Sequence, residues 1–476
     1  YIISEREVAK QLRSLNVKKS PGPDGIPNWV LKDFADILSG PVCSIFNASI
    51  RECKLPSIWK EATARPIPKV NPPKKIESDL RPISLTVILS KELETYVVRW
   101  LWNIVWPKMD PYQFGAIAKC STVHALVEML HHWFSATDKA KNKNYVHVTL
   151  VDYSKAFDRI DPNILIQKLL QYEIPIFLLH WVQDFLSNRY QRVKIGDIMS
   201  EKLNIWGTVP QGTKLGVFLF ILMINDLETC VPTYKYVDDT TIYNVSNDPA
   251  DTKLQVAMDN ILDWSSCNSM KINAKKTKEM LICFSKTPPD IPNILVNGEP
   301  LERVDSVTLL GVKITDNLAW NTHVNHIVKK AQQRLFFLTL LKRSKVSPKD
   351  IVHIFCAKIR PVLEYACPVW HGGLTDELTQ LLEHVQERAL RIAYPGVEYL
   401  AAMTMAGIPP LYLRRELQCK SFFQRIQDPE DKLHRILPPE RSNLKNTRNG
   451  TKYPLPDAKT ERYKNSFLPY ALFNLQ

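Results

Sequence analysis

Two adjacent aspartates, Asp238 and Asp239, are the residues of this sequence best suited to chemistry. They interrupt an aromatic and β-branched run, residues 234–243, whose composition is typical of β-strands, whereas aspartate is depleted in strands. The pattern predicts a hairpin of two short strands with both carboxylates at its tip. Two neighbouring anions repel, so one resists ionisation unless a cation lies between them, and a hard divalent metal commonly does so. The pair therefore indicates a Mg²⁺-dependent site.

A third carboxylate follows another expected strand. Residues 145–151 form an apolar run that predicts a buried strand, and Asp152 comes directly after it. A carboxylate at the end of a buried strand is costly unless it has a partner, so Asp152 is a candidate third ligand. Asp161 stands before Pro162 and is instead expected to cap a helix, which is a structural role.

Several polar segments are candidates to surround these carboxylates. Residues 65–75 and 81–85 combine proline with lysine and arginine, which predicts two stiff basic loops suited to phosphates or, more simply, exposed connectors. Residues 206–216 form a glycine-punctuated loop in which Gln211 can hydrogen-bond a base or a sugar. The lysines of residues 271–278 are suited to pyrophosphate, although a lysine run is more often a solvated surface.

Regular patterns predict the elements that hold these segments. Helical spacing occurs at residues 4–15, 30–50, 93–104, 215–224 and 251–266. A strand pair is expected within residues 307–314, and residues 320–425 resemble a separate helical domain. The last fifty or so residues are polar and basic, and we expect them to be extended or partly disordered until residues 467–475.

The composition favours an intracellular protein with an anionic partner. With 476 residues, about three domains are expected. The 62 Lys and Arg exceed the 49 Asp and Glu, and the net charge of +13 favours nucleic acid, although a solvated basic surface gives the same excess. The nine cysteines include no C-x-x-C pair and are expected to be reduced. The longest apolar run, residues 215–224, is too short to span a membrane, and no signal peptide opens the chain. Because the sequence begins with Tyr1, we expect it to start inside a longer reading frame.

Taken in order, the motifs resemble the reverse transcriptase of a non-LTR (LINE-type) retrotransposon. Each motif alone is weak, whereas their order and spacing together are specific, and the similarity covers almost all of the chain. The matching segments are Ser-Pro-Gly-Pro-Asp-Gly at 20–25, Arg-Pro-Ile-Ser-Leu at 81–85, Asp-x-x-Lys-Ala-Phe-Asp at 152–158, Pro-Gln-Gly at 210–212, Ile-Asn-Asp-Leu at 224–227, Tyr-Val-Asp-Asp at 236–239 and Asn-x-x-Lys-Thr at 273–277.

This resemblance implies an α+β fold of the right-hand polymerase type, with fingers, an antiparallel-sheet palm and a helical thumb. The expected divisions are an N-terminal extension of the fingers at 1–50, the fingers and palm at 51–315, the thumb at 316–425, and a basic, partly extended C-terminal tail at 426–476. Residues 309–311 resemble the strand that grips the primer.

The resemblance also implies a two-metal site. Asp152, Asp238 and Asp239, with the carbonyl of Tyr153, would hold two Mg²⁺ ions, or Mn²⁺, roughly 4 Å apart. One ion would lower the pKa of the primer 3′-hydroxyl, and the other would hold the triphosphate and the leaving pyrophosphate. Lys276 matches a lysine that protonates pyrophosphate.

Five further positions match family residues around the nucleotide. Lys69 and Arg81 match fingers residues that hold the triphosphate. Gln211 and Gly212 match the loop that lines the nucleotide and template. Phe157 matches the bulky residue that rejects a ribose 2′-hydroxyl, and the alternative is an ordinary core aromatic.

Two positions beside Gln211 depart from the family pattern. Val217 stands where such sequences usually have proline, and Thr208 stands where glycine is frequent. Losing the proline would relax the backbone, and a side chain at Thr208 would disfavour positive φ. A decayed copy is therefore one interpretation of the sequence.

Three functions remain open at this point. An active RNA-directed DNA polymerase, with an RNA template, a DNA primer or target and dNTP as partners, agrees with the intact aspartates. A catalytically dead, basic nucleic-acid-binding remnant is the second. An RNA-dependent RNA polymerase is the third, and Phe157 argues against it, because RNA synthesis must admit the 2′-hydroxyl. The sequence contains no recognisable endonuclease, zinc knuckle or RNase H motif, so target cleavage would need a missing upstream segment or another protein. Nuclear action is expected by analogy with the family.

Overall fold

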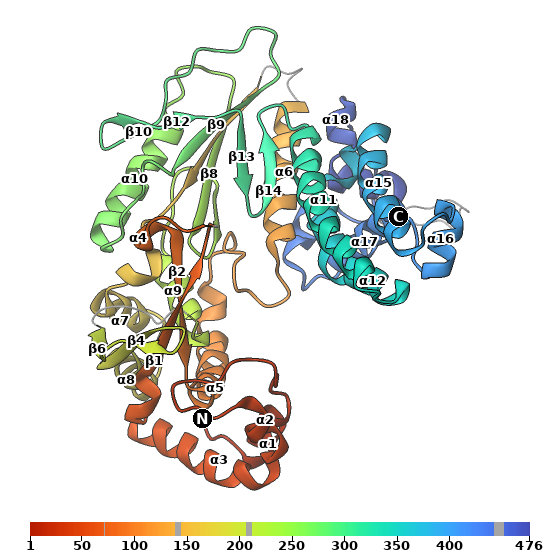
Figure 1. Ribbon diagram of the computed structural model, residues 1–476. Helices are drawn as coiled ribbons and strands as arrows, with labels where there is room; N and C mark the ends of the chain where they lie inside the picture. The colour runs from red at the N-terminus through yellow and green to blue at the C-terminus, as the bar shows by residue number, and fades with distance from the viewer. Residues whose placement is uncertain (71, 139–143, 206–211, 442–451) are drawn as a thin grey trace.

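The computed structural model describes residues 1–70, 72–138, 144–205, 212–441 and 452–476. Figure 1 shows a lobe that contains the sheets and carries the N-terminus, and beside it a helical lobe formed by the second half of the chain. Two hydrophobic cores run through the molecule. One joins α6 and one side of the central sheet to the helical lobe, and the other joins the N-terminal helices to the opposite side of that sheet. This is the α+β architecture expected of a polymerase.

The central, or palm, sheet has five strands with the apolar strand β3 in its middle. In spatial order the strands are β12 (Glu302–Arg303), β9 (Lys278–Cys283), β3 (Tyr145–Val151), β8 (Asp239–Ser246) and β7 (Thr233–Tyr236). Of the pairs in this sheet, only β12–β9 is parallel. The strand predicted at residues 145–151 is confirmed, and so is the aspartate hairpin, whose last pair joins Tyr236 to Asp239 across a two-residue loop.

Helices cover both faces of this sheet. Val146 and Val148 of β3 pack in the core that contains α6 (Thr122–Asp138), whereas Val151 packs in the other core, because alternate residues of a strand point to opposite faces. The second core contains α10 (Lys253–Cys267) and α9 (Lys214–Ile224), and α9 is buried on nearly every side. Both helices confirm the predictions from their spacing.

The fingers contain a second sheet, which corrects one prediction. The prediction of loops at residues 65–75 and 81–85 is wrong in part, because β1 (Glu61–Pro68) and β2 (Leu80–Thr86) form an antiparallel pair in which Pro66 faces Pro82. The prolines are tolerated because β1 pairs with β4 only over its first four residues, so no second strand among the described residues needs their missing N–H groups. The remaining members are α4 (Ile76–Asp79), β4 (Arg189–Ile195), β5 (Ile198–Met199) and β6 (Leu203–Ile205).

Helices support the fingers on the side of the N-terminus. The predicted first helix is present as α1, and Ser4 and Glu7 form a capping box at its start. Asp161 caps α7 by accepting a hydrogen bond from the backbone N–H of Asn163, as predicted. The helices of this region are α1 (Glu5–Arg13), α2 (Asn28–Asp33), α3 (Ala35–Glu52), α5 (Ile88–Val105), α7 (Pro162–Leu170) and α8 (Ile176–Leu186).

The expected thumb region is helical. The hairpin of β13 (Ser306–Leu309) and β14 (Val312–Thr315), which was predicted, leads directly into it. Its helices are α11 (Asn321–Arg343), α12 (Pro348–Ile354), α13 (Arg360–Glu364), α14 (Cys367–Trp370), α15 (Asp376–Ala393), α16 (Tyr399–Ala406) and α17 (Leu411–Ile426). In the part of the chain that the structure describes, no helix combines the length and the apolar character needed to cross a membrane.

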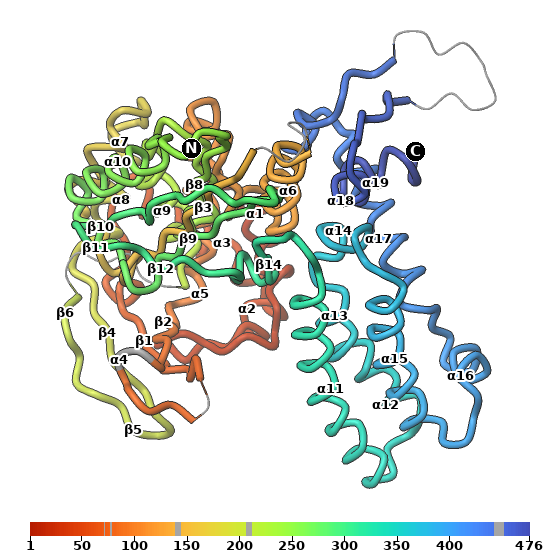
Figure 2. Tube along the Cα trace, turned by 90° about the horizontal axis from the view of Figure 1, so that it is seen from above, coloured from red at the N-terminus to blue at the C-terminus, as the bar shows by residue number. Residues whose placement is uncertain are grey.

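The C-terminal segment folds back onto the palm more than its composition predicted. Besides α19 (Phe467–Asn474), which matches the expected apolar end, it forms the short helices η6 (Lys432–Ile436) and α18 (Glu461–Lys464). All three contact α6, and Figure 2 shows α18 and α19 beside α14 and α17. The sequence pattern missed this because the apolar anchors, such as Leu433 and Tyr453, are widely spaced in a segment rich in charged residues and proline.

Candidate active site

The three aspartates meet at one end of the palm sheet. The β3–β8 ladder ends with the pair of Val151 and Thr240, so Asp152 follows one strand where Asp239 begins the other. Asp238 lies in the two-residue loop between Tyr236 and Asp239. The structure therefore brings together the carboxylates that the sequence singled out, from segments 86 residues apart (238 − 152 = 86).

Electrostatics within this group disfavour three negative charges. Burial raises the pKa of Asp238, and the charge of Asp152 raises it further, while the guanidinium of Arg81 opposes both effects. Burial, followed by the charges of Asp238 and Asp152, raises the pKa of Asp239 to about 6. Asp239 nevertheless remains exposed at the surface, so a cation can reach it from solvent and water screens part of the effect. The group favours a bound cation over bare carboxylates.

The donor set fits a hard metal ion in its chemistry. Oδ2 of Asp152 is buried and accepts no hydrogen bond from the described residues, and carboxylate oxygens are the ligands Mg²⁺ prefers. No three His, Cys, Asp or Glu side chains within the described ranges are gathered closely enough to enclose an ion. In proteins, Mg²⁺ is commonly held by one or two carboxylates, with substrate phosphates and water completing its shell.

The segment around Lys276 holds Asp152 by its backbone. The N–H of Asp152 donates to Oγ1 of Thr277 at 3.2 Å, and its carbonyl accepts from the N–H of Asn273 at 2.7 Å. Tyr153, whose carbonyl is a predicted metal ligand, forms a β-bridge with Ile272. The ammonium of Lys276 lies 3.9 Å from Oδ2 of Asp152 on a side chain that is 69% exposed. Lys276 is therefore at the site and open to solvent.

The charge of Arg81 reaches the carboxylates, whereas Lys69 forms a backbone hydrogen bond within the fingers. Arg81 is exposed on β2 opposite Ile67, and its charge acts on Asp238. Lys69 follows the end of β1, and its backbone N–H donates to the carbonyl of Asp79 at 2.7 Å.

The position of Phe157 is compatible with both of its interpretations. Phe157 lies in the short helix η3 (Ala156–Arg159), is half-buried, and stacks on Phe220 of α9 with ring centroids 4.7 Å apart. One part of the ring is thus a packing surface, and the remainder faces solvent.

Gly212 links the predicted nucleotide loop to the fingers. Its φ is +101°, and a Cβ at this position would lie 2.8 Å from the carbonyl oxygen of Ser84 on β2. Gln211 and Thr208 lie outside the described residues. Val217 lies inside α9, where the helix sets its φ, so the absence of proline does not loosen the backbone there.

Sequence reasoning missed a glutamine that contacts the aspartate loop. Oε1 of Gln113 accepts hydrogen bonds from the N–H groups of Gly115 at 2.9 Å and Val237 at 3.1 Å. Gly115 itself touches the loop so closely that a Cβ would collide with the nitrogen of Val237. The signal available in the sequence was Gly115, two positions after Gln113. Glycine lacks a Cβ, so it permits another backbone to approach closely.

It also missed Tyr365, which holds the turn predicted to grip the primer. The hydroxyl of Tyr365 donates to the carbonyl of Leu310 at 2.9 Å and lies 2.9 Å from Oγ1 of Thr122, at the start of α6. Leu310 and Gly311 both have positive φ, as a two-residue hairpin turn of type I′ requires. A single tyrosine between α13 and α14 had no distinguishing pattern in the sequence.

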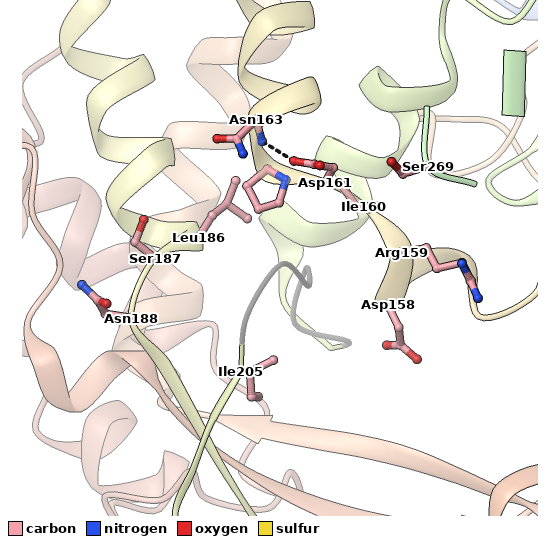
Figure 3. Close-up of a pocket in the computed structure, with 11 residues that line it drawn as sticks. Asp158, Arg159, Ile160, Asp161, Asn163, Leu186, Ser187, Asn188, Ile205 and Ser269 are labelled. Carbon is pink, nitrogen blue, oxygen red and sulfur yellow. Dashed lines mark hydrogen bonds between the residues drawn. The ribbon is translucent and has the colours of Figure 1, made fainter. Parts of the chain in front are cut away.

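A cavity of about 710 Å³ is lined by the end of η3, the start of α7, residues 186–188, Ile205 and Ser269. Figure 3 shows Asp158 and Arg159 at one side of it, and Ser187, Asn188 and Ile205 at the other. None of the three aspartates lines it, so the polymerase chemistry is not assigned to this cavity.

Two known protein families match parts of the chain. Residues 67–314 match the family described as "Reverse transcriptase (RNA-dependent DNA polymerase)". A shorter match joins residues 320–354 to "Alkylated DNA repair protein alkB homolog 8, N-terminal", and it covers only α11 and α12.

Curated relatives are found in mobile elements of Drosophila melanogaster. The chain is 26% identical to "Probable RNA-directed DNA polymerase from transposon BS" over 91% of this chain and 49% of that protein. It is 25% identical to the corresponding protein of transposon X-element, over 94% and 49%, and 25% identical to that of mobile element jockey, over 82% and 43%. The chain therefore spans about half the length of the curated relatives it matches.

Among solved structures, the telomerase of Candida albicans is similar at 12% sequence identity with a TM-score of 0.38. The similarity covers 80% of this chain and 68% of the telomerase chain. The family match covers more than half of the chain and includes all three aspartates. The chain therefore belongs to the reverse transcriptase family, and its relatives are the polymerases of non-LTR retrotransposons, as its motifs predicted.

Proposed function

We propose that this chain is an RNA-directed DNA polymerase that extends a DNA 3′-hydroxyl on an RNA template with dNTP. The observation that carries the proposal is the meeting of Asp152, Asp238 and Asp239 at the end of β3 and the β7–β8 hairpin in a member of this family. The net charge of +13 agrees with RNA and DNA as partners.

Each residue has a part in phosphoryl transfer. Asp152, Asp238, Asp239 and the carbonyl of Tyr153 would hold two Mg²⁺ ions, or Mn²⁺, which when bound acidify the 3′-hydroxyl and neutralise the phosphates. The 3′-hydroxyl loses its proton to water, its oxygen bonds to the α-phosphorus, the bond from that phosphorus to the bridging oxygen breaks, and pyrophosphate leaves. Lys276 supplies a proton to the departing oxygen, since its ammonium is exposed beside Asp152.

The fingers and η3 would bind the nucleotide. Arg81 and Lys69 neutralise the triphosphate, and phosphoryl transfer depends mainly on such positioning and charge stabilisation. Gln211 and Gly212 line the template and the base. Phe157 excludes the ribose 2′-hydroxyl. Cutting of the DNA target would belong to an endonuclease segment of the same reading frame or to another protein, and the reaction would take place in the nucleus.

Primer extension tests this proposal. Wild-type protein and Asp238→Ala are compared on an RNA template with a DNA primer, dNTP and Mg²⁺, and we expect extension only with wild type. Asp161→Ala is the matched control, since it removes a carboxylate that caps α7 and should cost about 1 kcal/mol of stability without stopping extension.

The remaining outcomes separate the alternatives. If no Asp238-dependent product forms while RNA binding persists and weakens with salt, the chain is a nucleic-acid-binding remnant rather than a polymerase. Preferential use of rNTP would point to an RNA polymerase and would remove the role given to Phe157.

A further inference from the structure

The loop that carries Asp238 has a backbone conformation that its sequence does not favour. Val237 has a φ of +60°, a left-handed conformation that is rare for a β-branched residue. Such a conformation persists only where neighbouring groups hold it. The direction of the Asp238 carboxylate depends on this loop, so the groups that hold Val237 also position a catalytic side chain.

Gln113 is the side chain that holds this loop. It is fully buried, and its Oε1 accepts from the N–H of Val237 at 3.1 Å and from the N–H of Gly115 at 2.9 Å. Two N–H donors at one atom require it to be the oxygen, which fixes the orientation of the amide. The flanking backbone is paired as well, because the N–H of Phe114 donates to the carbonyl of Lys235 at 2.8 Å and the N–H of Lys235 donates to the carbonyl of Tyr112 at 2.9 Å.

Gln113 is in turn held by the C-terminal segment. The ammonium of Lys432, in η6, donates to the backbone carbonyl of Gln113 and lies 4.6 Å from the ring centroid of Phe114. Burial lowers the pKa of Lys432 to about 8, as expected for an amine withdrawn from water. The next turn of this segment is fixed to α6, since Arg435 forms hydrogen bonds of 2.7 and 3.0 Å with the buried carboxylate of Glu128.

We propose that Lys432 and Gln113 are positioning residues of the polymerase site, forming a brace that runs from the C-terminal segment to the loop of Asp238. The inference rests on the proposed function and extends it to a part of the chain outside the matched family region, which ends at residue 314. Because Gln113 is fully buried and the ammonium of Lys432 donates to a backbone carbonyl, we assign both to positioning rather than to contact with substrate. Their effect is on the rate of chemistry through the geometry of Asp238, and not on substrate affinity.

The test compares Lys432→Met, Lys432→Arg and Asp138→Asn in single-turnover nucleotide addition, and it adds Gln113→Met in the measurement of hydrogen exchange. Lys432→Met keeps an unbranched side chain but removes both the hydrogen-bond donor and the positive charge beside Phe114, and Lys432→Arg restores both. Asp138→Asn is the matched control, because Asp138 accepts from the N–H groups of Lys459 at 3.0 Å and Thr460 at 2.8 Å and so anchors the same C-terminal segment far from the loop.

We expect Lys432→Met to slow nucleotide addition by about tenfold, as for a small displacement of a catalytic group, with the half-saturating dNTP concentration unchanged. Lys432→Arg should recover most of the rate. Hydrogen exchange in the peptide that contains Val237 should become faster in Lys432→Met, and faster still in Gln113→Met. Asp138→Asn should lower the melting temperature while the rate and the exchange at Val237 stay at wild-type values.

Two results would contradict the proposal that Lys432 and Gln113 hold the loop of Asp238. One is a wild-type rate and wild-type exchange in Lys432→Met. The other is an equal loss of rate in Asp138→Asn at a matched melting temperature, since that would assign the effect to docking in general. If wild-type protein shows no Asp238-dependent extension, the proposed polymerase function fails, and the exchange measurement still decides whether Lys432 and Gln113 hold the loop.

Discussion

Asp152 and Asp239 occupy the position immediately beyond the last pair of the β3–β8 ladder, the pair of Val151 and Thr240. Directly opposed residues of antiparallel strands have Cα atoms about 4.5–5.5 Å apart and point to the same face. The sheet register therefore forces two carboxylates together, and Asp238 adds a third from the adjoining loop. The raised pKa of Asp239 is a consequence of this register and of burial.

We expect the Mg²⁺ requirement to rise below about pH 6. The pKa of Asp239 is about 6, so protons compete with the metal as the pH falls through that value. The check is the Mg²⁺ concentration for half-maximal extension at about pH 5.5, 6.5 and 7.5, and an unchanged midpoint would contradict the expectation.

Without metal, protonation of the Asp239 carboxyl should stabilise the folded protein as the pH falls. The folded protein binds a proton at Asp239 below about pH 6, whereas the unfolded carboxyl has its ordinary pKa of 3.8. The free energy of unfolding should therefore increase as the pH falls from about 6 towards 4. Asp239→Asn should remove this dependence in thermal unfolding measured with a chelator.

Replacing Phe157 tests its two interpretations. Phe157→Ala should raise incorporation of rNTP relative to dNTP by at least about tenfold, as expected when a steric contact is removed. It should also cost about 1–2 kcal/mol of stability, because the ring stacks on Phe220. Phe157→Tyr keeps the bulk and is the control. Loss of stability with an unchanged rNTP to dNTP ratio would leave only the core interpretation.

The contact between Gly212 and β2 predicts an effect specific to activity. Gly212→Ala and Gly25→Ala both place alanine at positive φ, at about 1 kcal/mol each, but an added Cβ on Gly25 meets open space. Only Gly212→Ala pushes against the carbonyl of Ser84, so we expect it alone to weaken dNTP binding. Equal extension kinetics in the two variants would argue against a role for this contact.

Removing the hydroxyl of Tyr365 should loosen the primer. Tyr365→Phe loses the hydrogen bonds to Leu310 and Thr122 while keeping the ring beside Gly311. We expect faster dissociation of primer and template and shorter products, at an unchanged rate for the first nucleotide. Tyr412→Phe, at an exposed position of α17, is the control. Product lengths equal to wild type would show that the turn is stable without Tyr365.

The sequence predicted the elements whose patterns are local. The β3 strand, the aspartate hairpin and α9 follow from residue types and periodicity, and the motifs alone single out Asp152, Asp238 and Asp239. The order of motifs also identified the family. The predicted strands and helices each depend on neighbours within a few residues, whereas the family resemblance depends on the order of motifs from residue 20 to residue 277.

What the sequence could not predict depends on partners far along the chain. Proline disfavours strands, so the sequence predicts loops in place of β1 and β2, and only the limited pairing with β4 explains why proline is tolerated there. In the sequence, Lys432 is one of many charged residues in a polar tail. Its proposed positioning role depends on its hydrogen bond to Gln113, 319 residues earlier. The positions of Gln211 and Thr208 fall outside the described residues, and the functional divisions of the chain, like the role of Lys69, remain predictions.

The contact between Lys432 and Gln113 also has a consequence for the timing of synthesis. Lys432 is translated 195 residues after Val237 (432 − 237 = 195), which takes roughly 10–40 s at ordinary rates of elongation. During that interval the nascent chain carries all three aspartates without the lysine that braces their loop. We expect a polypeptide that ends before Lys432 to extend primers more slowly than the finished chain, so activity would develop only after the C-terminal segment has been made and has docked.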